Sequence, residues 1–119
     1  MALSDNGHSV NEHFVDRAPS VKATYEAILK AAKKLGPVKE EPKKTSIHLV
    51  RKSAFAGIAT RKSALILTLK SDSDLSSKRI HKREQASANR WHLEIKLESP
   101  ETVDGELVTW LKKAYELAG

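Results

Sequence analysis

Three short runs between Glu41 and Lys70 constrain the fold more than any other feature of the chain. Ser46–Val50, Phe55–Thr60 and Ala64–Lys70 alternate apolar and polar residues or are rich in β-branched ones, and short turns separate them. Such runs are typical of β-strands that bury one face. Because parallel neighbours need long crossover connections, turns this short predict antiparallel pairing.

Three further strands extend this sheet. Val38–Glu41 is short and charged, and Pro42 closes it in a way that only a sheet edge tolerates. Ile80–Ala86 is largely polar, and a turn at Ala88-Asn89 leads into Trp91–Leu97, which alternates strictly. Six short strands with tight connections predict a meander, in which each strand pairs with the next one along the chain.

Two amphipathic helices flank the strands. The first is expected from Ser20, which can act as its N-cap, to Leu35, because Gly36 can then take a left-handed conformation. The second is expected to begin at the segment Ser99-Pro100-Glu101, where serine can cap and proline suits the first turn. The apolar positions at helical spacing are Val21, Tyr25, Ile28, Ala32 and Leu35 in the first helix and Val103, Leu107, Trp110, Leu111, Ala114 and Ala118 in the second.

These elements predict an α+β fold. It is a two-layer sandwich, in which an antiparallel sheet of about five or six strands is flanked on one face by the N-terminal and C-terminal helices. The sheet positions expected to face the helices are Ile47, Leu49, Leu65, Leu67, Leu69, Trp91, Leu93, Ile95 and Leu97. Residues 10–119 are expected to form this single domain, and the polar residues 1–9 a disordered tail.

Composition excludes several classes of site. The chain has no cysteine, so a disulfide framework, a thiolate zinc site and a cysteine nucleophile are excluded. It has no signal-like start and no long apolar run, so we expect a cytoplasmic protein without a membrane span. No nucleotide-binding glycine loop or serine-hydrolase elbow is present, and no cofactor is expected.

The positive charge is concentrated in one part of the chain. Of the formal charge of +6, residues 37–70 contribute +6, residues 1–36 and 71–98 contribute +1 each, and residues 99–119 contribute −2. The candidate nucleic-acid-binding residues are the basic pairs of the predicted turns, Lys43, Lys44, Arg51, Lys52, Arg61 and Lys62. The alternative reading is that these are ordinary solvated turn residues.

The last two pairs belong to a repeat. Residues 51–55 (RKSAF) and 61–65 (RKSAL) are nearly the same pentapeptide, ten residues apart. In a meander, Lys43-Lys44 would lie near Arg61-Lys62, and Arg51-Lys52 near Lys78-Arg79. The basic charge would then be divided between the two ends of the sheet. A base-stacking platform is not expected, because most of the six aromatic residues fall at core positions.

Two hypotheses of a metal site have less support in the sequence than nucleic-acid binding. His48, His81 and His92 are expected on the solvated sheet face, but His81 and His92 would be about 13 Å apart along the strands, too far to share a metal ion. Glu94 and Lys96, with Asp72 or Asp74 upstream, superficially match a magnesium-dependent nuclease. Cross-strand ion pairing explains the same residues more simply.

Segments 42–48 (PKKTSIH), 54–58 (AFAGI), 90–92 (RWH) and 110–116 (WLKKAYE) resemble an uncharacterised bacterial family, domain of unknown function 5655. The resemblance covers about residues 10–118. Members of that family occur alone and fused to other modules, some linked to restriction systems, and the resemblance implies no catalytic residues. Residues 91–118 are also similar in pattern to the YjbR and MmcQ family, whose frataxin-like fold has been suggested to bind DNA.

The sequence therefore leaves three functions open. The first is a small binding module that contacts DNA or RNA non-specifically through its basic turns. The second is an adaptor that binds another protein through the open sheet face or an edge strand. The third is a magnesium-dependent nuclease, and an enzyme is the least expected of the three. The oligomeric state is not predicted.

Overall fold

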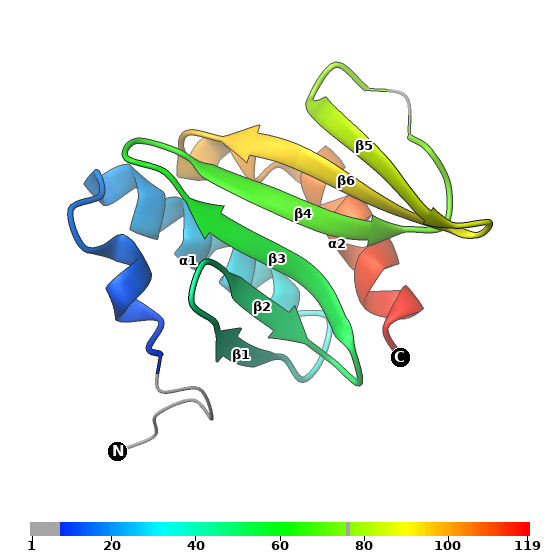
Figure 1. Cartoon of the computed structure of the whole chain (residues 1–119), viewed down its shortest axis with the longest axis horizontal. Helices are drawn as coiled ribbons and strands as arrows, with labels where there is room; N and C mark the ends of the chain where they lie inside the picture. The colour runs from blue at the N-terminus through cyan, green and yellow to red at the C-terminus, as the bar shows by residue number, and fades with distance from the viewer. Residues whose placement is uncertain (1–7, 76) are drawn as a thin grey trace.

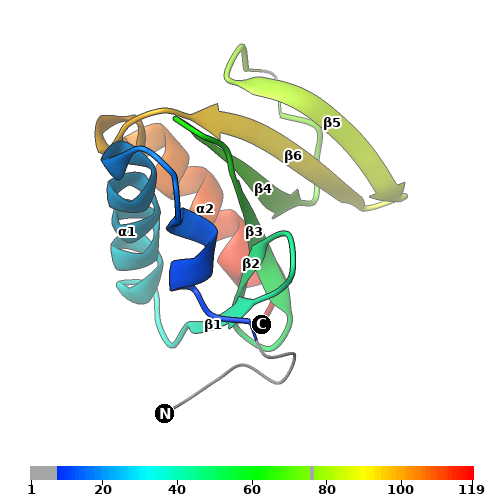
Figure 2. The ribbon, with the colours of Figure 1, turned by 60° about the vertical axis from the view of Figure 1, so that its left-hand side comes forward.

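The computed structural model describes residues 8–75 and 77–119 of the 119-residue chain. Within these residues, an antiparallel sheet of six strands packs against two α-helices, both on the same face of the sheet (Figure 1). Figure 2 shows the two layers from the side. The predicted α+β two-layer sandwich is confirmed. The predicted tail, residues 1–9, lies mostly outside the described residues.

The strands and helices agree with the predicted ones to within a few residues, apart from the start of the second helix. The strands are β1 (Lys39–Pro42), β2 (Ile47–Val50), β3 (Ala54–Thr60), β4 (Leu65–Ser71), β5 (Ile80–Ser87) and β6 (Arg90–Leu97). The helices are α1 (Pro19–Lys33) and α2 (Gly105–Leu117), with short 3₁₀ helices η1 (Asn11–Phe14) and η2 (Pro100–Thr102). In the described part of the chain, no helix is both long and apolar enough to cross a membrane.

The predicted meander is wrong at one side of the sheet. The strand order is β1-β2-β3-β4-β6-β5, so β4 pairs with β6, and β5 lies at the edge. β4 ends at Ser71, beside Trp91 near the start of β6, whereas β5 begins beside Ile95, near the end of β6. The strongly alternating β6 can bury one face beside β4, whereas β5 is exposed at every position after Ile80. The more polar strand therefore takes the edge.

The core lies between the sheet and the helices. Every sheet position predicted to face the helices is buried there, except that Trp91 is only partly buried. A shift of register at Val50 in the β2–β3 pair lets the consecutive residues Phe55 and Ala56 both face the core. The Phe55 ring meets Tyr115 of α2 edge-on, with 5.2 Å between ring centroids. Among the described residues, no α-helix covers the opposite face of the sheet, which is turned toward the viewer in Figure 1, and we call it the open face.

Both helices begin differently from the prediction. In α1, Pro19 takes the first helical position after Ala18, whose N–H donates to the carbonyl of Lys62 (2.8 Å), so Ser20 is not the cap. The segment after Ser99 forms only η2, and α2 begins at Gly105. Val103 interrupts the helix because its backbone is not helical (φ −83°, ψ 71°).

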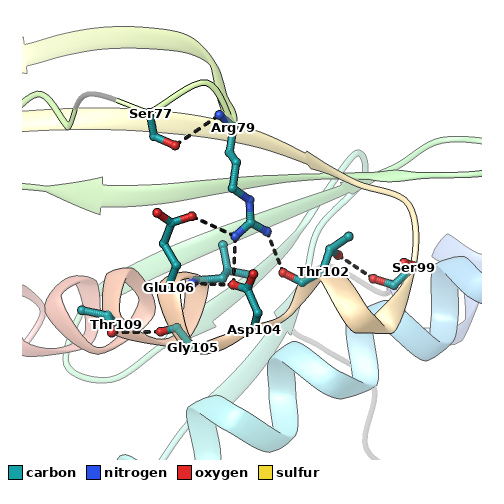
Figure 3. Close-up of polar contacts among 9 residues, drawn as sticks. Ser77, Arg79, Ser99, Thr102, Asp104, Gly105, Glu106 and Thr109 are labelled. Carbon is teal, nitrogen blue, oxygen red and sulfur yellow. Dashed lines mark hydrogen bonds and ion pairs between the residues drawn. The ribbon is translucent and has the colours of Figure 1, made fainter.

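A polar cluster fixes the start of α2 against β5 (Figure 3). Asp104 accepts the Leu107 N–H at 3.0 Å as the N-cap and accepts Arg79 Nη1 at 2.9 Å. The Leu107 N–H first, and then the Arg79 guanidinium, hold the pKa of Asp104 below its usual range. Arg79 also reaches Glu106 at 3.2 Å and the carbonyl of Thr102 at 2.6 Å. Arg79 is therefore a structural residue that joins the edge strand to the helix layer.

Candidate nucleic-acid interface

The two layers differ in charge. Residues 39–97, which form the strands and their connections, contain 14 lysines and arginines against 6 aspartates and glutamates. Residues 8–38 and 98–119, which form the helices, contain 7 against 8. The positive charge of the protein therefore belongs to its sheet layer, and the helix layer is close to neutral.

The basic pairs at the turns lie at both ends of the sheet. Lys43-Lys44 and Arg61-Lys62 share one end, as predicted, because Ile47 pairs with Ile58 and Thr60 with Leu65. The predicted neighbourhood of Arg51-Lys52 and Lys78-Arg79 is wrong. Arg51-Lys52 lies at the end of the sheet where β4 finishes beside Trp91, whereas β5 begins beside Ile95. Lys78-Arg79 therefore lies at the opposite end from Arg51-Lys52.

Three of the six candidate cations make side-chain contacts within the protein, although that of Arg61 is only with the carbonyl of its neighbour Thr60, at 3.1 Å. The Arg51 guanidinium lies 4.5 Å from the Tyr115 ring centroid and donates to the carbonyl of Tyr115 at 3.2 Å, at the C-terminal end of α2. Lys43 Nζ lies 3.6 Å from Glu41, and its carbonyl accepts from His13 Nε2 at 2.8 Å. Arg51 therefore points to the helix layer, and Lys43 is partly neutralised.

Other cations remain available to a ligand. Among residues 8–75 and 77–119, and apart from Arg51 and Lys78, seven lysines and arginines of the turns and the open face form no ion pair with an acidic side chain. They are Lys44, Lys52, Arg61, Lys62, Lys70, Arg90 and Lys96. The last three lie on the open face or at its border, because alternation along β4 and β6 turns their neighbours into the core. The sequence hypothesis named only turn residues and missed these three.

A groove runs along β3 on the open face, with a volume of about 320 Å³. Its floor is β3 itself, where the outward residues Ala54, Gly57 and Ala59 are all small. Its lining also includes Ser46 and His48 on the side of β2 and Thr68, Lys70 and His92 on the side of β4 and β6. We call this feature the β3 groove. The small residues Gly57 and Ala59 at alternating positions of β3 were a signal for it in the sequence that the sequence hypothesis did not use.

The comparison with known families agrees with the resemblance seen in the sequence. The family described as "Domain of unknown function (DUF5655)" matches residues 10–118, nearly the whole chain. The chain belongs to this family. No curated protein and no solved structure matches the chain, so the frataxin-like resemblance is not shown.

The histidines and carboxylates of this DUF5655 domain do not converge on a common point. His81 lies 3.7 Å from Glu94, whereas His92 pairs across the strands with Lys70 and Glu84. In the described part of the chain, no three histidine, aspartate or glutamate residues are grouped to hold a metal ion.

The carboxylates of the nuclease hypothesis lie on different parts of the sheet. Asp74 binds Arg83 Nε at 2.7 Å, and Arg83 is paired with the core residue Leu93. Asp74 is thus on the helix side of the sheet, while Glu94 is on the open face. Asp72 follows the end of β4, about 13 Å along the strand from the partner of Glu94. The structure does not bring two of these carboxylates together for magnesium.

The two edge strands of the DUF5655 domain discourage addition of a further strand. β1 is four residues long, ends in proline, and carries the ion pairs of Lys39 and Lys43 with Glu41. β5 carries charged residues at the edge and two shifts of register against β6. Short, charged or bulged edges are features that prevent pairing with another strand. Edge-strand docking of a protein partner is therefore less favoured than binding on the open face.

Proposed function

We propose that this DUF5655 domain binds nucleic acid without sequence specificity, through its basic turns and the open face of its sheet. The observation that carries the proposal is the charge difference between the layers, since the sheet layer has a net charge of +8 and the helix layer −1. A one-sided positive surface attracts and orients a phosphate backbone. The cytoplasmic location and the bacterial source of the protein stay predictions from the sequence.

The absence of sequence specificity follows from the side chains available. Sequence is read by side chains that reach base edges, whereas lysine and arginine on mobile turns contact phosphates. The large aromatic residues point elsewhere: Phe55 and Tyr115 pack together in the core, and Trp110 lies under Arg79. Bases are therefore not held on an aromatic platform.

The binding should depend steeply on salt. If all seven unpaired cations contact phosphates, the logarithm of the affinity for a single strand should fall with the logarithm of salt concentration with a slope of about −5. Fluorescence anisotropy with a labelled oligonucleotide, measured over a range of salt concentrations, gives this slope directly. The absence of any binding at low salt would contradict the proposal.

Charge reversal tests the location of the surface. Lys52→Glu, Arg61→Glu and Lys62→Glu together should weaken binding at least about tenfold and reduce the salt slope by roughly 2, because three phosphate contacts are lost. The matched control reverses three exposed lysines of the helix layer, Lys30, Lys112 and Lys113, which gives the same net charge. Equal loss of affinity in the two variants would show that net charge alone matters and that the proposed surface is wrong.

A further inference from the structure

We propose that the β3 groove is the path of single-stranded nucleic acid, with the strand running along β3 from one basic turn to the other and its backbone lying over Gly57. This inference rests on the proposed function and specifies the form of its ligand. It predicts a preference for single strands over duplexes that the basic turns alone would not produce.

The depth of the groove depends on one glycine. Gly57 lies between His48 of β2 and Thr68 of β4 in the register of the sheet. A Cβ atom placed on Gly57 would lie 3.8 Å from His48 Cδ2 and 4.0 Å from Thr68 Cβ. These are ordinary contact distances, so a methyl group would fit, but it would fill the space on the groove floor between His48 and Thr68. A larger side chain would have to project into the groove.

The lining of the groove suits an anion. His48, Thr68, Lys70 and His92 provide imidazole, hydroxyl and ammonium groups, and no carboxylate is among the described lining residues. Lys70 Nζ lies 3.3 Å from Ser53 Oγ, an exposed contact that a phosphate oxygen can replace.

Three lining residues have an acidic residue opposite them in the sheet: Glu41 is opposite His48, Glu84 is opposite His92, and Glu94 is opposite Thr68. Glu41 lies 3.6 Å from Lys39 and from Lys43. Glu94, opposite Thr68, lies 3.7 Å from His81 and 3.9 Å from Lys82. It therefore offers little repulsion to a phosphate in the groove.

The repeated pentapeptide places basic residues at each end of the groove, although Arg51 points to the helix layer and only Lys52 of that pair is available to the ligand. Arg51-Lys52 comes just before β3, and Arg61-Lys62 comes directly after it. The seven residues of β3 span about 20 Å, a length that suits roughly four nucleotides, the low end for single-strand sites. The division of basic charge between the two ends of the sheet, which the sequence predicts, is thus what a linear path along β3 requires.

Single-stranded and duplex nucleic acids differ in flexibility, and this difference should decide which of them enters the groove. A duplex is stiff over about 50 nm, so it cannot bend down onto a floor only one strand wide and would contact the turns alone. A single strand can follow the groove and place its phosphates beside Lys70 and Thr68. The flat groups that remain for a base are the imidazole rings of His48 and His92, on which bases can stack without sequence preference.

The decisive variant is Gly57→Leu, which fills the groove but leaves every basic residue in place. Anisotropy with an oligothymidylate and with a duplex of the same length should show single-strand affinity reduced at least about tenfold and duplex affinity changed less than about twofold. Gly57→Ala should give an intermediate loss. The matched control is Gly105→Leu on α2, where an added Cβ has nothing within 4 Å. Thermal melts of each variant verify that the fold is retained.

The other outcomes separate the two proposals. Unchanged single-strand affinity in Gly57→Leu, with weaker binding after reversal of the basic turns, would overturn the groove path and leave the proposed function standing. Equal loss for single strands and duplexes would also overturn it. Failure of the unmodified protein to bind either form would remove both proposals.

Discussion

The hydroxyl group of Thr60 should hold the N-terminal segment on the sheet. Thr60 is 8% exposed, and its Oγ1 donates to the carbonyl of His13 at 2.7 Å and accepts Arg17 Nε at 3.1 Å. His13 in turn lies on the turn that carries Lys43. Thr60→Val keeps the shape of the side chain and removes both hydrogen bonds. The variant therefore isolates the contribution of the hydroxyl group.

The loss of stability in Thr60→Val depends on which of its two hydrogen-bond partners, His13 or Arg17, is left without a replacement bond. The carbonyl of His13 would be left without its donor, which costs about 1–2 kcal/mol, whereas the exposed Arg17 can turn to water and contributes little. We expect a loss of about 1.5 kcal/mol in the free energy of unfolding, or about 5 °C in Tm for a chain of this length.

Calorimetry and hydrogen exchange together measure the effect of Thr60→Val. The amides of His13 and Arg17 should exchange faster in the variant, because the segment that contains η1 loses its anchor. Thr60→Ser is the control, since it keeps the hydroxyl group and should preserve the protection of those amides. An unchanged Tm together with unchanged protection in Thr60→Val would refute the reasoning.

Two further perturbations test the backbone and the electrostatics. Gly36→Ala should destabilise the fold by about 1–3 kcal/mol in urea unfolding, because Gly36 has φ +152° and an added Cβ would collide with the Tyr115 hydroxyl. Gly57→Ala, at an unstrained position, should change stability by less than about 1 kcal/mol, and equal losses would contradict this account. Because the pKa of Asp104 is lower in the folded state than in the unfolded chain, its ionised form stabilises the folded state above about pH 4, near the pKa of the unfolded chain. This contribution is lost as the pH falls through the lower pKa of the folded state. The Tm difference between the protein and Asp104→Asn should therefore shrink from pH 6 toward pH 2.5, and a constant difference would assign the effect to something other than this carboxylate.

Local patterns determined most of the secondary structure. Alternation in segments such as 91–97 reveals which residues are buried wherever one sheet face is covered, so the strands and the core face could be predicted from the sequence. The start of α2 could not. Serine and proline at 99–100 are typical of a helix start, but Asp104 caps the helix instead, with Arg79 from the turn before β5 beside it. Asp104 is itself a typical N-cap residue, but the local sequence offers Ser99 as a second one, and the contact with Arg79, 25 residues away, cannot be read from it.

Some features of the candidate interface could likewise be predicted from the sequence, and others could not. The sequence by itself determined that the strands carry the positive charge and that a basic pair stands on either side of residues 54–60, because both are properties of the order of residues. Only the tertiary structure decided which cations remain unpaired, since Arg51 reaches the end of α2 and Arg79 the start of it through contacts between distant segments. Only the tertiary structure, too, placed His48, Thr68 and Lys70 around Gly57, because strand register brings together residues that are far apart in the chain.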